Sequence, residues 1–237
     1  MAIESLGTIL SVWAHPDDES YLAAGLMAAA RDRGQRVVCV SATAGELGTP
    51  EPQVWPPARL SRTRRWESAA AMAVLGVVEH HQLGLPDGRL DAHDAEGRAA
   101  VARLFDEVAP DTVLTFGPDG LTFHPDHQAV HRWVGAAWRA RQCRARLLFA
   151  AMTAPHLARF GDLYERWDVY MTDDRPAGVR PDELALHLLL EGDDLDRKLA
   201  ALRAHATQTE GVVRSLGLDT YAALVAEEAF VAGSGAR

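Results

Sequence analysis

Segments with the pattern of β-strands alternate with helical segments through the first 141 residues of the chain. The strand-like runs are short and rich in valine and other β-forming residues, and they cover residues 8–13, 35–42, 77–82 and 112–116. Helical patterns cover residues 19–33, 58–75, 95–108 and 125–141. Strands joined by helices imply right-handed crossovers and a parallel sheet. We therefore expect an α/β chain with a Rossmann-like three-layer fold and a mostly parallel sheet.

The second half of the chain has a weaker pattern. Short strands are expected at residues 146–152, 166–171 and 183–190, helices at residues 193–205 and 219–228, and a frayed tail at residues 231–237. An irregular stretch at residues 45–57 is either a lid over the site or an ordered surface loop or oligomer contact. The 237 residues are 48% hydrophobic and contain no convincing linker, so one domain spanning residues 1–237 is expected.

Composition and short motifs exclude several classes of protein. A net charge of −9 disfavours binding to nucleic acid, and no uninterrupted apolar run is long enough to predict a membrane span. The chain lacks a G-x-G-x-x-G and a P-loop motif, so nucleotide binding has no support. Its two cysteines fit no metal or redox motif, and its first residues do not resemble a signal peptide. These features predict a cytoplasmic protein.

Two similar motifs follow the first and fourth predicted strands, HPDDE at residues 15–19 and HPDH at residues 124–127. In an open parallel sheet, sites form at the carboxyl ends of the strands, so the motifs should meet there. A catalytic zinc site uses three protein ligands and water, and His15, Asp18 and His127 would supply such a set. A single motif of this kind could be a capping turn at a helix start, but two with extra ligands favour a metal site.

The remaining motif residues suit hydrolysis of a carbon–nitrogen bond. Zinc lowers the pKa of water, so Asp17, between two expected ligands, can serve as the general base. His124 can stabilise a developing oxyanion or protonate the leaving amine. Zinc is the expected cofactor, although two histidines and one carboxylate also suit Fe(II).

These residues resemble the zinc-dependent N-acetylglucosaminyl deacetylase family, called PIG-L or LmbE-like. The resemblance is strongest in the two histidine motifs, the first of which follows Ala14. Further similar segments are TAGELG at residues 43–48, LPDG at residues 85–88, Arg64-x-x-Glu67 and the helix at residues 198–208. The resemblance implies the same roles for His15, Asp17, Asp18, His124 and His127, and a small-molecule amino-sugar substrate.

The resemblance also implies three substrate-binding residues. Arg64 would contact sugar hydroxyls or the oxyanion, unless it pairs with Glu67 or lies on a solvated helix face. Glu46 and Asp87 would hydrogen-bond the sugar, although both could equally make turns. His205 could reach the site, but a surface or core position is favoured. Thr122 stands where some thiol-sugar deacetylases of the family have a tyrosine, which increases the role of His124.

The resulting expectation is a zinc-dependent hydrolase that removes an acyl group, foremost acetyl, from an N-acylated amino sugar or glycoconjugate. One alternative is an amidase acting on a thiol conjugate or an acylated natural product. A non-enzyme alternative is a metal-dependent sugar-binding module, which would not need Asp17 and His124. A metallophosphoesterase is disfavoured, because two-metal sites need more bridging carboxylates. The sequence leaves open whether the chain forms a homo-oligomer.

Overall fold

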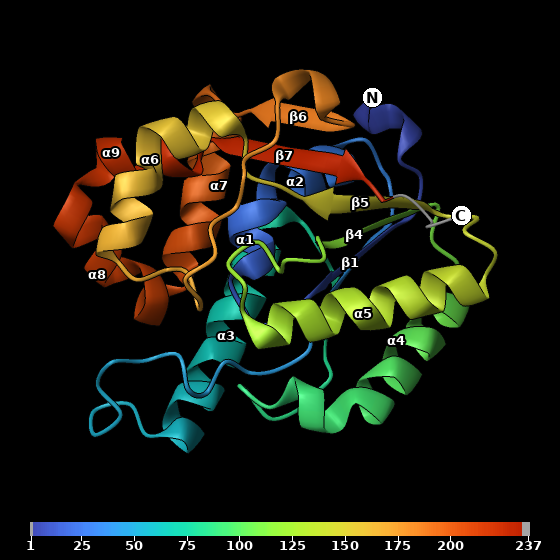
Figure 1. Cartoon of the computed structure of the whole chain (residues 1–237), viewed down its shortest axis with the longest axis horizontal. Coiled ribbons are helices and arrows are strands. Elements are labelled where there is room, and N and C mark those ends of the chain that lie inside the picture. The colour runs from blue at the N-terminus through green and yellow to red at the C-terminus, as the bar shows by residue number, and fades with distance from the viewer. Residues whose placement is uncertain (1, 234–237) are drawn as a thin grey trace.

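The structure of the chain is a computed structural model that describes residues 2–233, and these residues form one seven-stranded sheet (Figure 1). The strand order is β3-β2-β1-β4-β5-β7-β6. The strands are β1 (Ile9–Trp13), β2 (Val37–Ser41), β3 (Glu79–Gln82), β4 (Thr112–Phe116), β5 (Arg146–Ala150), β6 (Leu186–Leu189) and β7 (Glu227–Ala232). The α-helices are α1 (Asp18–Leu22), α2 (Ala24–Asp32), α3 (Pro57–Leu75), α4 (Asp94–Val108), α5 (Pro125–Ala140), α6 (Ala154–Arg166), α7 (Gly192–Ala204), α8 (Ala206–Leu216) and α9 (Leu218–Val225). Short 3-10 helices cover Ile3–Ser5, Leu90–His93 and Pro181–Glu183.

The five strands from β3 to β5 run parallel, which confirms the predicted Rossmann-like fold. Strands β1, β2 and β4 are buried along their whole length, because helices cover both faces of the sheet. Helices α2, α3 and α7 pack together in one layer, and α4 and α5 pack together in the other. Buried parallel strands need continuous apolar runs rather than alternation, and the sequence supplies them.

The order of the strands reverses between β1 and β4. From β1 the chain adds β2 and then β3 on one side, and it then crosses to place β4 on the other side of β1. The two strands pair in parallel, with Ile9 opposite Thr112 and Ser11 opposite Leu114. Their carboxyl ends therefore open a crevice, because the loops that follow them turn to opposite faces of the sheet. The two histidine motifs lie in these two loops.

The last third of the chain differs from the prediction. Residues 166–171 are not a strand: α6 occupies residues 154–166, where Thr153 caps it by accepting a hydrogen bond from the His156 N–H. The prediction of a frayed tail at residues 231–237 is also wrong for residues 231 and 232, because they belong to β7, which pairs antiparallel with both β5 and β6. Residues 234–237 of that predicted tail lie outside the described part of the chain. Helix α8 was not expected either. Pairing between distant strands has no local sequence pattern, which explains the error at β7.

A second apolar cluster lies apart from the core of the sheet. It joins helices α6, α7 and α9, with α8 packed against it, and these helices gather at the left of Figure 1. Its buried members are Phe160, Leu199, Leu202, Tyr221, Leu224 and Val225. Since α6 follows β5 directly, this group of helices stands beside the carboxyl ends of the parallel strands. It therefore forms a wall next to the crevice.

Candidate metal centre and active site

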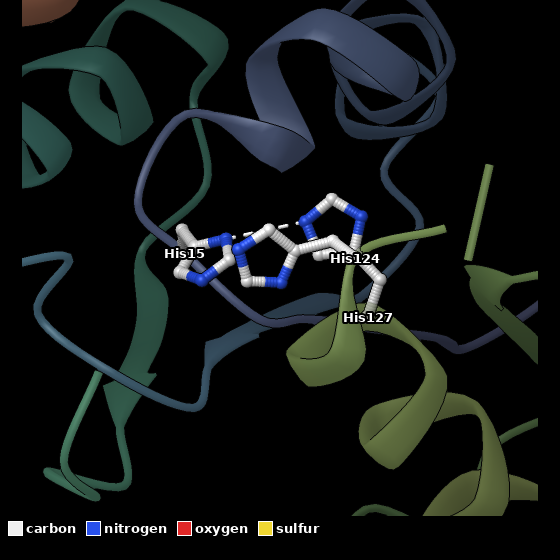
Figure 2. A group of neighbouring side chains, drawn as sticks. All are labelled: His15, His124 and His127. Carbon is white, nitrogen blue, oxygen red and sulfur yellow. Dashed lines mark hydrogen bonds between the residues drawn. The ribbon is translucent and has the colours of Figure 1, made fainter. Parts of the chain in front are cut away.

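The two histidine motifs meet at the crevice between β1 and β4. His15 comes from the loop after β1, whereas His124 and His127 come from the start of α5 (Figure 2). The ring centroids of His15 lie 4.7 Å from His124 and 5.1 Å from His127, and those of His124 and His127 lie 4.8 Å apart. The fold thus joins two segments that are about 110 residues apart in the chain.

The expected ligand atoms have the spacing of a tetrahedral metal site. His15 Nδ1 lies 3.2 Å from His127 Nε2 (Figure 2) and 3.6 Å from Asp18 Oδ2, and Asp18 Oδ1 lies 3.5 Å from His127 Nε2. Zinc bonds of about 2.0–2.1 Å in a tetrahedral array place ligand atoms about 3.4 Å apart. The backbone N–H of His15 holds the Asp18 carboxylate through a hydrogen bond of 2.7 Å. These three side chains therefore bring donor atoms to about the separation that a zinc-sized cation needs. Two other groups, His15 with His124 and His127, and His15 with Asp87 and Asp126, also have ligand atoms that all lie within 4.8 Å of one another.

A second set of groups holds the outer nitrogens of both histidines. His15 Nε2 lies 3.2 Å from Asp87 Oδ1 and 3.4 Å from Asp126 Oδ2. His127 Nδ1 donates to the carbonyl of Gly120 over 2.8 Å. In His127 the proton is thereby held on Nδ1, and the lone pair of Nε2 faces the centre. In His15 the two carboxylates hold a proton on Nε2, and Nδ1 is the nitrogen that faces the centre. Metal-binding histidines in proteins have this arrangement, which fixes the tautomer and the ring.

Gly120 is required at the contact with His127. Its φ of +67° is one that side chains other than glycine rarely adopt, and an added Cβ would lie 2.9 Å from the Cβ of His127. The glycine lets the backbone carbonyl approach the imidazole. The orientation of His127 therefore depends on the backbone conformation of Gly120 as well as on the HPDH motif.

The electrostatics of the cluster also favour a cation. Burial lowers the pKa of His127 to about 4, so its ring is neutral and its lone pair is free at neutral pH. Burial raises the pKa of Asp18, but the neighbouring His127 and His15 outweigh it and the net pKa is lowered. Burial would lower the pKa of His15, yet its contacts with Asp126, Asp18 and Asp87 raise that pKa well above its usual value. The three carboxylates around this imidazole thus favour a positive charge at the centre of the cluster.

Asp17, the expected base, has a strained backbone beside the ligands. Its φ of 113° lies outside the conformations usual for a non-glycine residue. Its N–H donates to the Glu19 carboxylate, with N–O distances of 3.2 and 3.3 Å, and Arg64 donates to the carbonyl of the preceding Pro16. Burial raises the pKa of Asp17 to about 6, against the opposing charge of Arg64. A carboxylate with a pKa near the operating pH suits a general base.

Arg64 contacts the Asp17 loop in the structure. Its side chain is buried, its Nη2 lies 3.2 Å from Asp17 Oδ2, and its Nη1 donates to the carbonyl of Gly45 over 2.7 Å. Both alternatives for Arg64 are wrong, since Glu67 instead accepts hydrogen bonds from Thr207 and the guanidinium is not solvated. The implied contact with sugar hydroxyls stays a prediction, and in the structure the guanidinium contacts the Asp17 carboxylate instead.

Among the described residues, one ring nitrogen of His124 has no hydrogen-bond partner. His124 caps α5, and its Nδ1 accepts a hydrogen bond of 3.1 Å from the backbone N–H of Asp126. The proton of the neutral ring is therefore on Nε2. Burial, together with the neighbouring charge of His15, lowers the pKa of His124. A neutral imidazole with an N–H available can donate a hydrogen bond to an oxyanion.

Glu46 and Asp87 join the loops after β2 and β3. Glu46 Oε1 accepts from the Asp87 N–H over 3.0 Å, and Asp87 Oδ2 accepts from the Leu47 N–H over 2.8 Å. These bonds fit the turn-making alternative for both residues, and Asp87 in addition contacts His15. Their implied contacts with a sugar remain predictions.

Sequence reasoning missed two side chains that support the site. Asp126 contacts His15 and accepts hydrogen bonds from Gly88 and Leu90, and it is the third letter of the HPDH motif. Glu19, the last letter of HPDDE, is fully buried and lies 3.3 Å from His205 Nε2. Both residues belong to the two histidine motifs, but no structural role was assigned to Asp126 or Glu19 from the sequence. His205 lies in the core, as favoured, and its contact with Glu19 has no signal in the sequence.

Comparison with known proteins places the chain in a family. Residues 10–138 match the PIG-L family, described as GlcNAc-PI de-N-acetylase. The chain belongs to the PIG-L family, which the two histidine motifs indicated.

Individual relatives extend this similarity beyond the matched segment. The chain is 31% identical to 1D-myo-inositol 2-acetamido-2-deoxy-alpha-D-glucopyranoside deacetylase of Mycobacterium sp. (strain KMS), over 86% of this chain and 75% of that protein. It is 32% identical to the probable N-acetyl-alpha-D-glucosaminyl L-malate deacetylase 2 of Bacillus subtilis (strain 168), over 88% of this chain and 86% of that protein. Its fold resembles that of N,N'-diacetylchitobiose deacetylase from Pyrococcus horikoshii, with a TM-score of 0.66, 21% identity, and coverage of 98% of this chain and 85% of that one.

Proposed function

We propose that this chain is a metal-dependent deacetylase that hydrolyses the amide bond of an N-acylated amino sugar or glycoconjugate. The relatives named above act on N-acetylated glucosaminyl compounds, and family membership makes the chain a deacetylase-type hydrolase. The observation that carries the proposal is the spacing of His15, Asp18 and His127 next to Asp17. A sugar-binding module would need the ligands but not a strained, buried carboxylate beside them.

His15, Asp18 and His127 are proposed to hold one divalent metal, with zinc as the first candidate. When bound, the metal supplies Lewis-acid chemistry, which lowers the pKa of water and polarises a carbonyl. Two imidazoles and one carboxylate also suit Fe(II), so Fe(II) is the second candidate. Asp87, Asp126 and the Gly120 carbonyl keep the two imidazoles in the required tautomers.

The proton transfers are assigned to Asp17, and oxyanion stabilisation to His124. Asp17 accepts a proton from the attacking water as the water oxygen bonds to the acyl carbon. His124 donates its Nε2–H to the negative charge that develops on the acyl oxygen. When the carbon–nitrogen bond breaks, the leaving nitrogen takes the proton from Asp17, which yields a free amine and a carboxylic acid. A neutral His124 with one N–H suits the stabilising role better than that of acid.

Two further proposals concern where the chain acts. Within residues 2–233, no helix is long and apolar enough to cross a membrane. Cys39 is buried and Cys143 exposed, and both are free thiols, which supports a reducing, cytoplasmic location. The proposed partner is a small-molecule amino sugar, whereas a homo-oligomer remains a prediction.

The proposed function is tested with a panel of N-acylated amino sugars. The purified chain is stripped of metal with a chelator, reloaded with zinc or Fe(II), and assayed by release of the primary amine. We expect amine release only after reloading, with N-acetylglucosamine compounds among the substrates. Equal rates in the stripped and reloaded protein, or hydrolysis of phosphate esters instead of amides, would refute the proposal.

A further inference from the structure

A large cavity adjoins the candidate metal centre. Its volume is about 610 Å³, and Asp18 and His127 form part of its wall. The remaining wall comes from α1, from the segments after β4 and β5, and from helices α6, α8 and α9, which stand at the left of Figure 1. A substrate whose amide lies at the metal centre therefore extends directly into this cavity.

The wall of the cavity is apolar. Leu22, Leu121, Met152, Trp167, Val169 and Val212 contribute aliphatic or aromatic surface. Among the residues that the structure describes, no lysine, arginine, asparagine or glutamine lines this cavity. Sugars, inositols and dicarboxylic acids are bound through amide, cationic and carboxylate side chains that match their hydroxyls or charges. The described part of the cavity wall therefore offers no cationic or amide group to an anion or a polar ring, and Thr122, Ser215 and Glu227 are its few aliphatic hydroxyl and carboxylate groups away from the metal centre.

The polar atoms that do line the cavity are largely bonded to one another. The Tyr164 hydroxyl lies 2.7 Å from His156 Nε2, and His156 Nδ1 lies 3.2 Å from Glu227 Oε2. The hydroxyls of Tyr21 and Tyr221 lie 3.1 Å apart. Burial raises the pKa of Tyr164, so this hydroxyl stays neutral. Since these donors and acceptors pair internally, the side chains present mainly ring faces and hydrocarbon to an occupant.

The size of the cavity exceeds what an acetyl group needs. Its volume of about 610 Å³ lies within the roughly 300–1,000 Å³ that is typical of sites for whole small molecules. An acetyl group adds one methyl beyond the reacting carbonyl. The cavity is thus larger than an acetyl group, and the rest of it is available to other parts of the substrate.

We infer that the cavity binds an apolar group of the substrate, an alkyl chain or an aromatic ring carried by the amino sugar. This inference rests on the proposed function, because it assigns the group to the substrate of the same metal centre. The group is either the acyl chain on nitrogen or the aglycone on the anomeric carbon, since both are attached near the reacting amide. In either case the part of the substrate inside the cavity is hydrocarbon, whereas an inositol or a malate group in that position would be polar.

Two series of substrates distinguish these sources. The first varies the acyl chain, with N-acetyl-, N-butanoyl- and N-octanoylglucosamine, and the second varies the aglycone, with methyl, phenyl and octyl glycosides of N-acetylglucosamine. Each buried methylene is worth about a fourfold change. We expect kcat/KM of the zinc-loaded enzyme to rise at least about 10²-fold along one series. Two flat or falling series, with amine still released, would overturn the cavity assignment alone, whereas no amine from any substrate would overturn the proposed function as well.

Two helical glycines provide a matched pair of variants. Gly211 in α8 lines the cavity and Gly161 in α6 does not, and an added Cβ at either position meets no heavy atom within 4 Å. We expect Gly211→Phe to lower the ratio of kcat/KM for the longest to the shortest substrate about tenfold, and Gly161→Phe to leave that ratio unchanged. Equal ratios in the two variants would contradict the assignment.

A binding measurement gives a readout independent of turnover. Octyl glucosaminide, or N-octanoylglucosamine with an Asp17→Asn enzyme, is titrated by calorimetry against glucosamine as the reference. We expect at least about tenfold tighter binding of the apolar ligand, with a negative heat-capacity change that marks burial of hydrocarbon. Equal affinities, or binding with no heat-capacity change, would contradict the inference.

Discussion

The two walls of the site are built from different parts of the chain and by different physics. The metal wall comes from loops within residues 14–127, where buried charges meet at spacings set by hydrogen bonds. The cavity wall comes largely from helices within residues 154–225, where apolar side chains enclose a volume. The chemistry requires fixed distances, but accommodation of a hydrocarbon group requires only shape and an absence of free polar atoms. Because the two walls come from separate segments, we expect substitutions in the cavity wall to alter the accepted substrate and leave the ligand cluster unchanged.

The metal wall should be intolerant of any change in its ligands. His15→Ala and Asp18→Ala each remove one of three donors and leave buried partners unpaired, so we expect loss of bound metal and at least about a 10³-fold fall in kcat. Metal content by mass spectrometry and amine release check this together. His93→Ala, at a partly exposed histidine outside the site, is the control and should keep both. A His15→Ala protein with full metal content and turnover would show that the metal wall lies elsewhere.

Arg64 tests whether the metal wall includes groups that never contact the metal. Arg64→Met removes the charge beside Asp17 and the donors to two buried carbonyls. We expect about a 10²-fold fall in kcat with a smaller change in KM, and a loss of about 3 kcal/mol in the free energy of unfolding. Steady-state kinetics and urea denaturation measure the two effects. Arg65→Met, at the exposed neighbouring arginine, should change neither, and identical behaviour of the two variants would remove the positioning role of Arg64.

Asp126 tests the outer contacts of the ligands. Asp126→Ala removes one of two carboxylates facing His15 Nε2, together with the acceptor for two backbone N–H groups. We expect zinc affinity to fall about 10- to 100-fold, and activity at saturating zinc to fall much less. Competition with a chromophoric chelator gives the affinity. An unchanged zinc affinity would mean that Asp87 alone fixes the His15 ring.

The smallest expected effect is that of a substitution at Tyr164, which lies in the cavity wall. Tyr164→Phe removes the hydroxyl bonded to His156 Nε2 and leaves the ring in place. We expect the free energy of unfolding to fall by about 1 kcal/mol and zinc content to stay constant. Urea denaturation and metal analysis check the pair of values. A loss of zinc in this variant would contradict the view that changes in the cavity wall leave the metal site unchanged.

How much the sequence predicts also differs between the two walls. The parallel strands and the two histidine motifs are local patterns, and the topology of a parallel sheet brings their loops to one edge, so the placing of His15 beside His127 followed from the sequence. The orientation of Arg64 toward Asp17 did not, because its neighbours Arg62 and Arg65 carry the same charge and only the packing of α3 distinguishes them.

The cavity itself was not predicted, although the helices at residues 19–33 and 219–228 that supply part of its wall were. Many of its other residues come from α6 and α8, which were missed as helices, and the place of α9 and β7 depends on contacts between distant segments. Apolar residues on such helices have the same pattern whether they fill a core or line a cavity. Val212 and Val213 adjoin in α8, yet only the first lines the cavity among the described residues.

The central claim is that Asp17 is the base beside a metal held by its neighbours, and Asp17→Asn tests it most directly. The measurement is zinc content and kcat on the same preparation, with Asp162→Asn, at an exposed carboxylate of α6, as the matched control. We expect Asp17→Asn to bind zinc as the unmodified chain does and to lose at least about 10²-fold in kcat, while the control keeps both. Full turnover by a zinc-loaded Asp17→Asn enzyme would contradict the assignment.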